Sequence, residues 1–228
     1  MKPVREAPRL HRLTRFGAIN AYLVTEDDGL TLVDTGLSGL APAFLDGARR
    51  LGAPITRVTL THAHGDHAGS WDALREALPE AEFSAGQREQ RLLEEERRLD
   101  PDEPPAKVRG SWPTLAHYPD RLLADGDRVG SLRVVFSPGH TPGHVAYLDE
   151  RDGTLIAGDA FQTLGGIAVS GQIRPLFPLV AMATWHKPTA VSSAATLRAL
   201  EPARLAVGHG KVLDEPLSAM EKAIAAAR

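Results

Sequence analysis

Short apolar runs separated by turn residues fill the first third of the chain. Apolar residues occupy positions 18–24 and 30–33, and an Asp-Asp-Gly turn lies between them at 27–29. Two apolar runs joined through such a turn predict a β-hairpin. A β-branched run at 55–60 predicts one further strand.

Helices are predicted on both sides of that strand. Residues 40–51 carry apolar side chains at helical spacing, and Gly52 follows them as a stop signal. Residues 70–79 predict a second helix with Ser70 as its N-cap. Residues 87–99 predict a third, highly charged helix, whose Glu/Arg pairs are typical of a solvated face.

Two irregular stretches interrupt the rest of the pattern. Residues 100–118 are rich in proline, and residues 161–188 mix glycine and proline with large apolar side chains. A long loop inside a compact domain is often a functional lid. Each stretch is therefore expected to form either a lid or an interface. An interface of this kind would join two copies of the chain in a homodimer.

The second half of the chain returns to strands and ends in helices. Strands are predicted at 132–136 and around an Asp-Gly turn at 152–153, and a helix follows at 189–200. A last strand and loop at 204–210 precede a helix at 216–227. Two layers of sheet covered by helices accommodate this order, which indicates an α/β fold.

Composition narrows the class of protein without identifying it. Of the 228 residues, 43% are hydrophobic and 24% are charged, which is typical of a soluble globular protein. The net charge of −3 offers no basic surface for nucleic acid, and no apolar run suits a membrane span or a signal peptide. We therefore expect a cytoplasmic protein without nucleic-acid or membrane partners. The lack of cysteine excludes disulfides, thiolate metal ligands and a cysteine nucleophile.

Three histidines and one aspartate fall within six consecutive residues of the segment THAHGDHAG. At the end of a strand, side chains two residues apart point the same way, so His62 and His64 can reach one metal ion together. Asp66 and His67 follow a glycine turn, which can direct them towards a second metal position next to the first. The segment therefore supplies two pairs of metal ligands rather than one tetrahedral set.

Three more residues of metal-ligand type follow other predicted strands. His140 lies in SPGHTPGH, Asp159 in IAGDA and His209 in AVGHG, each beside small residues that let the backbone turn sharply. Open α/β sheets place their active sites at the carboxyl ends of strands. These three residues are therefore expected to join the histidine cluster.

The complete set resembles the metallo-β-lactamase-fold hydrolases, whose five motifs are an early Asp, HxHxDH, a middle His, a later Asp and a final His. All five occur here in order, beginning with Asp34 in LVDTG. The resemblance covers nearly the whole chain. It implies an αββα sandwich of two mixed β-sheets flanked by helices, in a single domain spanning residues 1–228.

The resemblance also implies a dinuclear site, in which two triads of ligands are joined by one carboxylate. The first triad would be His62, His64 and His140, and the second Asp66, His67 and His209. The joining carboxylate would be Asp159. Asp34 would support the base of the site without being a ligand.

Nitrogen and oxygen ligands without a thiolate suit two divalent ions, with zinc as the first expectation and iron or manganese as alternatives. Two ions about 3.5–4 Å apart lower the pKa of a shared water towards roughly 7. We therefore expect a metal-bridging hydroxide to attack an ester, lactone or thioester carbonyl. Asp66 would also carry a proton to the leaving group.

The lactonase and glyoxalase II-like branch fits the chain length and the ligand set best. Glyoxalase II-type enzymes usually carry a helical C-terminal extension, whereas only 19 residues follow His209 here. Acyl-homoserine lactonases carry a tyrosine three residues after the bridging aspartate, where this chain has Gln162. That departure puts that particular substrate in doubt.

Apolar side chains within 161–188 favour a small-molecule substrate with an apolar acyl group. The alternative for these apolar side chains is that they pack the loop down or form a dimer interface. For His186, the alternative is that it caps a helix. The candidate substrate contacts are Phe161, Gln162, Phe177, Trp185 and His186.

A mononuclear iron oxidoreductase of the persulfide dioxygenase type is the alternative function. Such enzymes share the fold and bind one iron through two histidines and an aspartate. The intact second triad favours the hydrolase.

Overall fold

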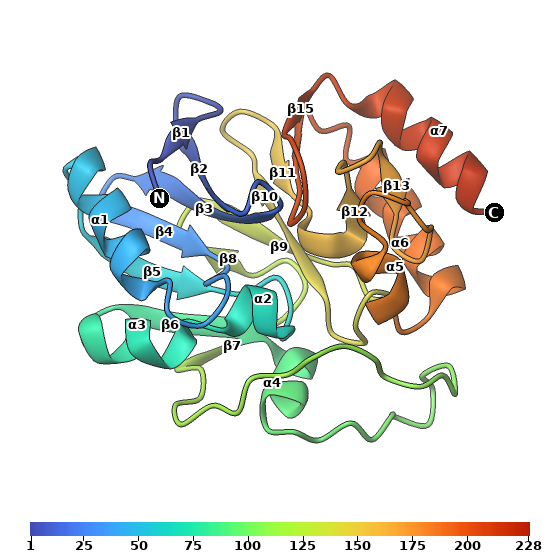
Figure 1. Cartoon of the computed structure of the whole chain (residues 1–228), viewed down its shortest axis with the longest axis horizontal. Coiled ribbons are helices and arrows are strands. Elements are labelled where there is room, and N and C mark those ends of the chain that lie inside the picture. The colour runs from blue at the N-terminus through green and yellow to red at the C-terminus, as the bar shows by residue number, and fades with distance from the viewer.

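The computed structural model describes all 228 residues, and these form four layers in the order helix, sheet, sheet, helix (Figure 1). The first sheet has seven strands, hydrogen-bonded in sequence order. They are β1 (Val4–Arg5), β2 (Leu10–Arg15), β3 (Ile19–Glu26), β4 (Gly29–Val33), β5 (Ile55–Thr59), β6 (Glu82–Gly86) and β7 (Arg121–Leu123). Neighbours from β1 to β4 are antiparallel, and neighbours from β4 to β7 are parallel.

The second sheet has six strands in the order β15-β14-β11-β10-β9-β8. They are β8 (Arg128–Val129), β9 (Leu132–Phe136), β10 (Val145–Asp149), β11 (Thr154–Ile156), β14 (Arg204–Ala206) and β15 (Leu213–Asp214). Only β11 and β14 run parallel. A separate two-stranded ribbon joins β12 (Phe161–Gln162) to β13 (Ala168–Val169). Both large sheets are therefore mixed, as the resemblance implied.

Helices cover the outer face of each sheet (Figure 1). Those with their apolar faces on the first sheet are α1 (Ala41–Leu51), α3 (Trp71–Ala77) and α4 (Gln87–Leu93). The single turn α2 (Gly65–Ala68) lies between α1 and α3 in the chain. Those on the second sheet are α6 (Lys187–Ala199) and α7 (Leu217–Ala227), with the short α5 (Leu179–Ala183) before them. None of these helices combines the length and apolar character needed to cross a lipid bilayer.

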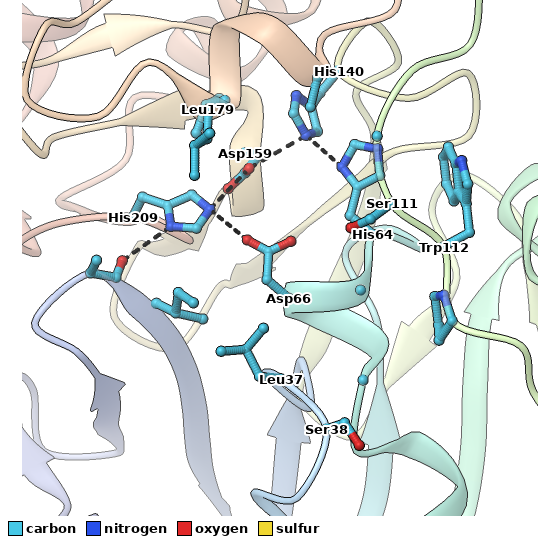
Figure 2. Close-up of a pocket in the computed structure, with 18 of the residues that line it drawn as sticks. Leu37, Ser38, His64, Asp66, Ser111, Trp112, His140, Asp159, Leu179 and His209 are labelled. Atoms are coloured by element: carbon cyan, nitrogen blue, oxygen red, sulfur yellow. Dashed lines mark hydrogen bonds and ion pairs between the residues drawn. The ribbon is translucent and has the colours of Figure 1, made fainter.

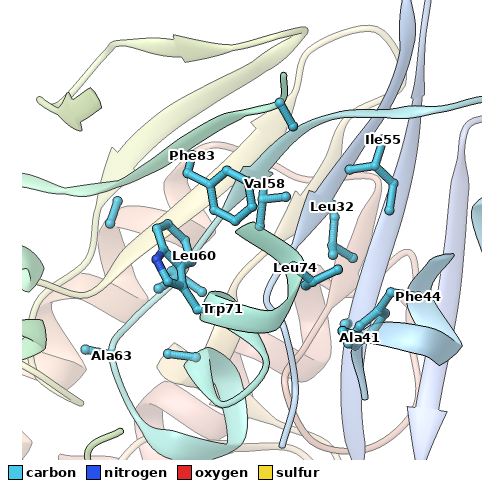
Figure 3. Packing of buried hydrophobic residues seen from close by; sticks show 14 of the residues in the cluster. Leu32, Ala41, Phe44, Ile55, Val58, Leu60, Ala63, Trp71, Leu74 and Phe83 are labelled. Atoms are coloured by element: carbon cyan, nitrogen blue, oxygen red, sulfur yellow. The ribbon is translucent and has the colours of Figure 1, made fainter. Parts of the chain in front are cut away.

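The buried apolar residues fall into three clusters, one for each interface between layers. Successive side chains of a strand point to opposite faces of its sheet, so one strand can serve two clusters. In β3, Leu23 packs towards the outer helices, whereas Tyr22 packs between the sheets. The outer cluster of the first sheet centres on Phe44, Trp71 and Phe83 (Figure 3). The αββα sandwich is confirmed by this layering.

The predicted hairpin is β3–β4, and the helix before Gly52 is α1, which ends with Gly52 in the left-handed conformation. Ser70 is the N-cap residue of α3, as predicted, but its side chain makes no capping hydrogen bond. Its hydroxyl instead donates to the Leu37 carbonyl and accepts from the Leu40 amide.

The charged helix predicted over 87–99 is α4 alone, and it ends at Leu93. It is not wholly solvated, since Glu89, Leu92 and Leu93 are buried on one face. Glu89 lies three and four residues before the two leucines, which is the spacing of one helix face.

Candidate metal centre

The seven predicted metal ligands meet at one edge of the sandwich. Figure 2 shows His64, Asp66, His140, Asp159 and His209 of this set. The histidine cluster begins just after β5, and His140 follows β9. Asp159 follows β11, and His209 follows β14, which is parallel to β11. The carboxyl ends of parallel strands lie at the same edge of a sheet, which brings residues distant in sequence together.

The first triad, His62, His64 and His140, places one ring nitrogen of each residue within 4.8 Å of the others. The Nδ1 atom of His64 lies 2.9 Å from Nε2 of His140. In the second triad, Asp66, His67 and His209, the ligand atoms also lie within 4.8 Å of one another. The two triads are the same ones that the resemblance implied.

Asp159 lies between the triads. Its Oδ2 atom is 3.4 Å from Nε2 of His140 and 3.2 Å from Nε2 of His209, so it faces one residue of each triad. Its Oδ1 atom is 3.5 Å from Nε2 of His67. One carboxylate therefore reaches both halves of the centre.

The unpaired polar atoms of the centre suit metal ions. Nε2 of His62, Nε2 of His67 and Oδ1 of Asp159 are buried and lack any hydrogen-bond partner. Such atoms are costly to bury without a partner. Imidazole nitrogens and carboxylate oxygens are ligands that zinc, iron and manganese accept. The donor set therefore fits divalent metal.

Two ligands are oriented from the base of the site by Asp34. Its carboxylate accepts from the backbone N–H of Thr61 at 2.7 Å and from the Thr61 hydroxyl, and it lies 2.9 Å from Nδ1 of His67. The Thr61 hydroxyl also contacts Nδ1 of His62 at 3.0 Å. Metal-binding histidines commonly use their second nitrogen in this way, which fixes the ring. Asp34 is thus a supporting carboxylate, as predicted.

The other three histidines are held through their second nitrogens as well. His64 uses Nε2 on the Arg109 carbonyl at 2.9 Å, and His209 uses Nδ1 on the Ala18 carbonyl at 3.1 Å. His140 uses Nδ1 on the Ser170 hydroxyl at 2.9 Å. Every ring is therefore fixed from behind while its other nitrogen faces the centre.

His144, the second histidine of the SPGHTPGH loop, supports the bridging residue. Burial lowers the pKa of His144 to about 3, so the ring is neutral. Its Nε2 accepts from the backbone N–H of Asp159 at 3.1 Å, and its Nδ1 lies 2.9 Å from the Ser137 hydroxyl. This contact fixes the turn that presents Asp159.

Opposite charges accumulate in the metal-free centre. Burial acts to lower the pKa of His67 and His209, but the surrounding carboxylates together outweigh it and raise the two pKa values to about 9 and about 10. Asp159 and Asp66 act on both histidines, and Asp34 also acts on His67. Burial acts to raise the pKa of Asp159 and Asp66, yet the neighbouring histidines hold both well below the ordinary range. Metal ions must therefore displace protons from His67 and His209 in order to bind.

A cavity of about 1130 Å³ opens above the ligands (Figure 2). The segments 110–115 and 177–183 form much of its wall, together with the turn before β3. Phe177, one of the predicted substrate contacts, is among the large apolar residues that line it. These residues include Phe16, Ile19, Trp112, Phe177, Leu179 and Met182.

The charged side chains of the lining, apart from the histidines, are all carboxylates, since neither lysine nor arginine contributes to it. Two arginines stack on aromatic residues of the wall from outside the lining. They are Arg15, 4.2 Å from the Phe16 ring centre, and Arg97, 5.8 Å from that of Trp112. The four carboxylate residues are Asp66, Asp72, Glu76 and Asp159.

Four of the five candidate substrate residues do not line the cavity, and the prediction for them is corrected. Phe161 is fully buried in the cluster beneath α6 and α7, and Gln162 is buried beside it in the chain. Trp185 is buried and donates its indole N–H to the Ala106 carbonyl. His186 caps α6 by accepting from the Thr189 amide, which was the alternative stated for it. Apolar composition alone did not indicate which way these side chains point.

Comparison with known proteins agrees with this geometry. The model of the metallo-beta-lactamase superfamily matches residues 14–209. The chain is 45% identical over 221 residues to the "uncharacterized protein YobT" of Bacillus subtilis (strain 168), and the match covers 95% of each chain. It is 32% identical to the probable metallo-hydrolase YybB of the same strain, over 64% of this chain and 63% of that one.

A hydroxyacylglutathione hydrolase of Xanthomonas axonopodis pv. citri is 33% identical, but over 63% of this chain and only 46% of that protein. Among solved structures, a metallo-beta-lactamase from Pontibacter korlensis superposes with a TM-score of 0.73 at 17% identity, covering 99% of this chain and 98% of that one. TTHA1623 in a di-iron-bound form gives a TM-score of 0.66 at 27% identity, covering 96% and 97%. The shared fold and the match over residues 14–209 establish that the chain belongs to the metallo-beta-lactamase superfamily.

Proposed function

We propose that this chain is a dinuclear metal-dependent hydrolase of ester, lactone or thioester bonds, in the lactonase and glyoxalase II-like branch. One observation carries the proposal: the carboxylate of Asp159 lies within 3.5 Å of ligands from both triads. A carboxylate in that position would be a ligand to both ions. The hydroxyacylglutathione hydrolases among the relatives support the branch, and the "di-iron-bound form" of TTHA1623 supports two ions.

Zinc is the metal we propose first, with iron or manganese as alternatives, since all the ligands are imidazoles and carboxylates. When bound, two such ions polarise the carbonyl and lower the pKa of a shared water, which supplies hydroxide at neutral pH. The protein supplies fixed ligand geometry through the contacts of Asp34, Arg109, Ser170 and Ala18 behind the rings.

Asp66 is the candidate catalytic residue of the chain. Its side chain is 30% exposed and lines the cavity, whereas the other ligands are almost wholly buried. Burial acts to raise its pKa, but the charge of His67 and the hydrogen bond of His209 keep the pKa well below its ordinary value. Asp66 is therefore ionised at neutral pH and able to accept a proton and pass it to a leaving group.

The cavity favours a small neutral substrate with an apolar acyl group. Its aromatic and aliphatic wall suits such a group. An anionic group would meet the Asp72 and Glu76 carboxylates with no lysine or arginine in the lining to balance it. Glutathione thioesters carry carboxylates, so we propose a substrate different from that named in the hydroxyacylglutathione hydrolase relatives.

Elemental mass spectrometry of protein purified without added metal tests the proposal first. We expect two divalent ions per chain, and loss of the paired ions in Asp159→Ala. A panel of lactones, esters and thioesters then compares apolar with carboxylated acyl groups of equal size, and we expect hydrolysis of the apolar series. One iron per chain together with oxygen consumption on persulfides would instead identify an oxidoreductase of the persulfide dioxygenase type.

A further inference from the structure

A buried carboxylate outside the ligand set lies beneath the first triad. Glu89 of α4 is completely buried, and no cationic side chain forms an ion pair with it. Burial raises the pKa of Glu89 to about 7, against the effect of the hydrogen bonds that it accepts. Burying a carboxylate among neutral groups is unfavourable. Packing of α4 therefore does not explain a glutamate at this position.

The groups that Glu89 accepts from belong to the two loops that carry the first triad. Its Oε2 atom accepts from the backbone N–H of Ala63 at 2.8 Å. Its Oε1 atom accepts from the Thr141 hydroxyl and from the backbone N–H of Gly143, the latter at 3.0 Å. One side chain therefore connects two loops that are far apart in sequence.

Two of these three contacts are made by residues directly next to a ligand. Ala63 lies between His62 and His64, and Thr141 follows His140 directly. The backbone of α4 also lies close against the second loop, because a Cβ added at Gly143 would be 2.5 Å from the Glu89 nitrogen.

The second triad has no contact with Glu89. His67 is held by Asp34 at 2.9 Å, and His209 is held by the Ala18 carbonyl at 3.1 Å. Disturbing Glu89 should therefore act on the two halves of the centre unequally.

We propose that Glu89 is a positioning residue that sets the separation between the 62–64 loop and the 140–143 loop, and thereby the geometry of the first metal site. The inference rests on the proposed dinuclear function. Its carboxylate holds three donors that no neutral side chain of the same shape can satisfy together. Glutamine has a single acceptor oxygen, so Glu89→Gln leaves an amide NH₂ facing one of the donors.

The test is a zinc titration of the metal-free protein in competition with a chromophoric chelator. Loss of supporting contacts typically costs about 10- to 100-fold in metal affinity. We expect Glu89→Gln to weaken one of the two zinc ions by about tenfold or more and to leave the other nearly unchanged. Glu94→Gln, at the exposed end of the same helix, should bind both ions as the wild type does. Equal affinities for both ions in Glu89→Gln and wild type would overturn the proposal.

A milder variant and a second readout keep the test decisive. If Glu89→Gln folds poorly, Thr141→Val replaces it in the test, because it removes one donor without changing the carboxylate. We expect this variant to lose less zinc affinity than Glu89→Gln, at the same ion. Hydrogen exchange of the metal-free protein reports the contacts directly, since the Ala63 and Gly143 amides should exchange faster in Glu89→Gln. If the wild type binds fewer than two ions, the dinuclear function fails, and this exchange readout still decides the role of Glu89. Unchanged exchange at both amides would then reject it.

Discussion

A single methyl group at Gly110 should disable the first metal site. Gly110 has a φ of +117°, and a Cβ added there would lie 2.0 Å from Nε2 and 2.3 Å from Cδ2 of His64. Because real Cβ contacts essentially never fall below 3.0 Å, the imidazole or the loop must move by about 1 Å or more. The ring has little free space, since it is buried and packs against Trp112 with ring centres 4.6 Å apart.

The expected loss follows from that displacement. Moving His64 breaks its 2.9 Å contact with the Arg109 carbonyl and shifts Nδ1 relative to His140. A misplacement of about 1 Å can cost about 100-fold in rate, and loss of a supporting contact costs about 10- to 100-fold in metal affinity. We expect Gly110→Ala to weaken zinc binding at the first site by at least about tenfold and to lower kcat/KM by about 100-fold.

Backbone strain needs a separate control, because an alanine at positive φ costs about 1–2 kcal/mol wherever it lies. Gly126 provides one: its φ is +84°, and an added Cβ would meet no atom within 4 Å. Gly126→Ala should lose similar stability in urea unfolding yet keep both zinc affinities and full activity. Equal zinc affinities in the Gly110→Ala and Gly126→Ala proteins would refute the steric reasoning.

Three further outcomes are expected. The melting temperature of chelator-treated protein should fall as pH rises through about 9 and 10, because His67 and His209 have raised pKa values in the folded protein. Their protonation stabilises the fold fully below the unfolded pKa of about 6.5, and this stabilisation is lost above the folded pKa values. A flat or rising profile would contradict this, and zinc-loaded protein should lack the fall. Phe177→Ala should raise KM about fivefold for long acyl chains, from about 1 kcal/mol of lost apolar contact, and an equal effect at every chain length would argue against an acyl site. Phe44→Ala, which truncates a fully buried side chain of α1, should cost about 3–5 kcal/mol in urea unfolding. Arg49→Ala, at an exposed position of the same helix, should change stability by less than about 0.5 kcal/mol.

The ligand set was predictable because its residues have few other uses where they stand. A histidine or aspartate directly after an apolar strand, beside glycine, is poorly suited to a core and lies where sheets place their sites. His140 and Asp159 are examples, and the structure brings them to within 3.4 Å of each other. The layered fold was also indicated by the sequence, since β3 carries a continuous apolar run from Ala21 to Val24 and such a run must be covered on both faces.

The residues around the ligands were less predictable, because their roles depend on direction rather than on composition. Phe177 and Trp185 are both aromatic and lie in one irregular stretch, yet only Phe177 faces the cavity. Glu89 was hidden in a run of charges, and its burial depends on contacts with loops far along the chain. The spacing of Glu89 from Leu92 and Leu93 was the available signal, since it puts the carboxylate on the apolar face of α4.

The proposed first metal site and the proposed substrate cavity share one segment of this protein. The Arg109 carbonyl holds the His64 ring and Gly110 leaves room for it, while Ser111 and Trp112 line the cavity. The backbone of the loop is anchored by groups outside it: the Gly65 amide donates to the Ser111 carbonyl at 2.8 Å. Irregular backbone needs such partners for its polar groups, and the same contacts fix the wall over the first triad. Substitutions in 109–112 made to alter the substrate should therefore also change metal affinity, and effects there should not be additive.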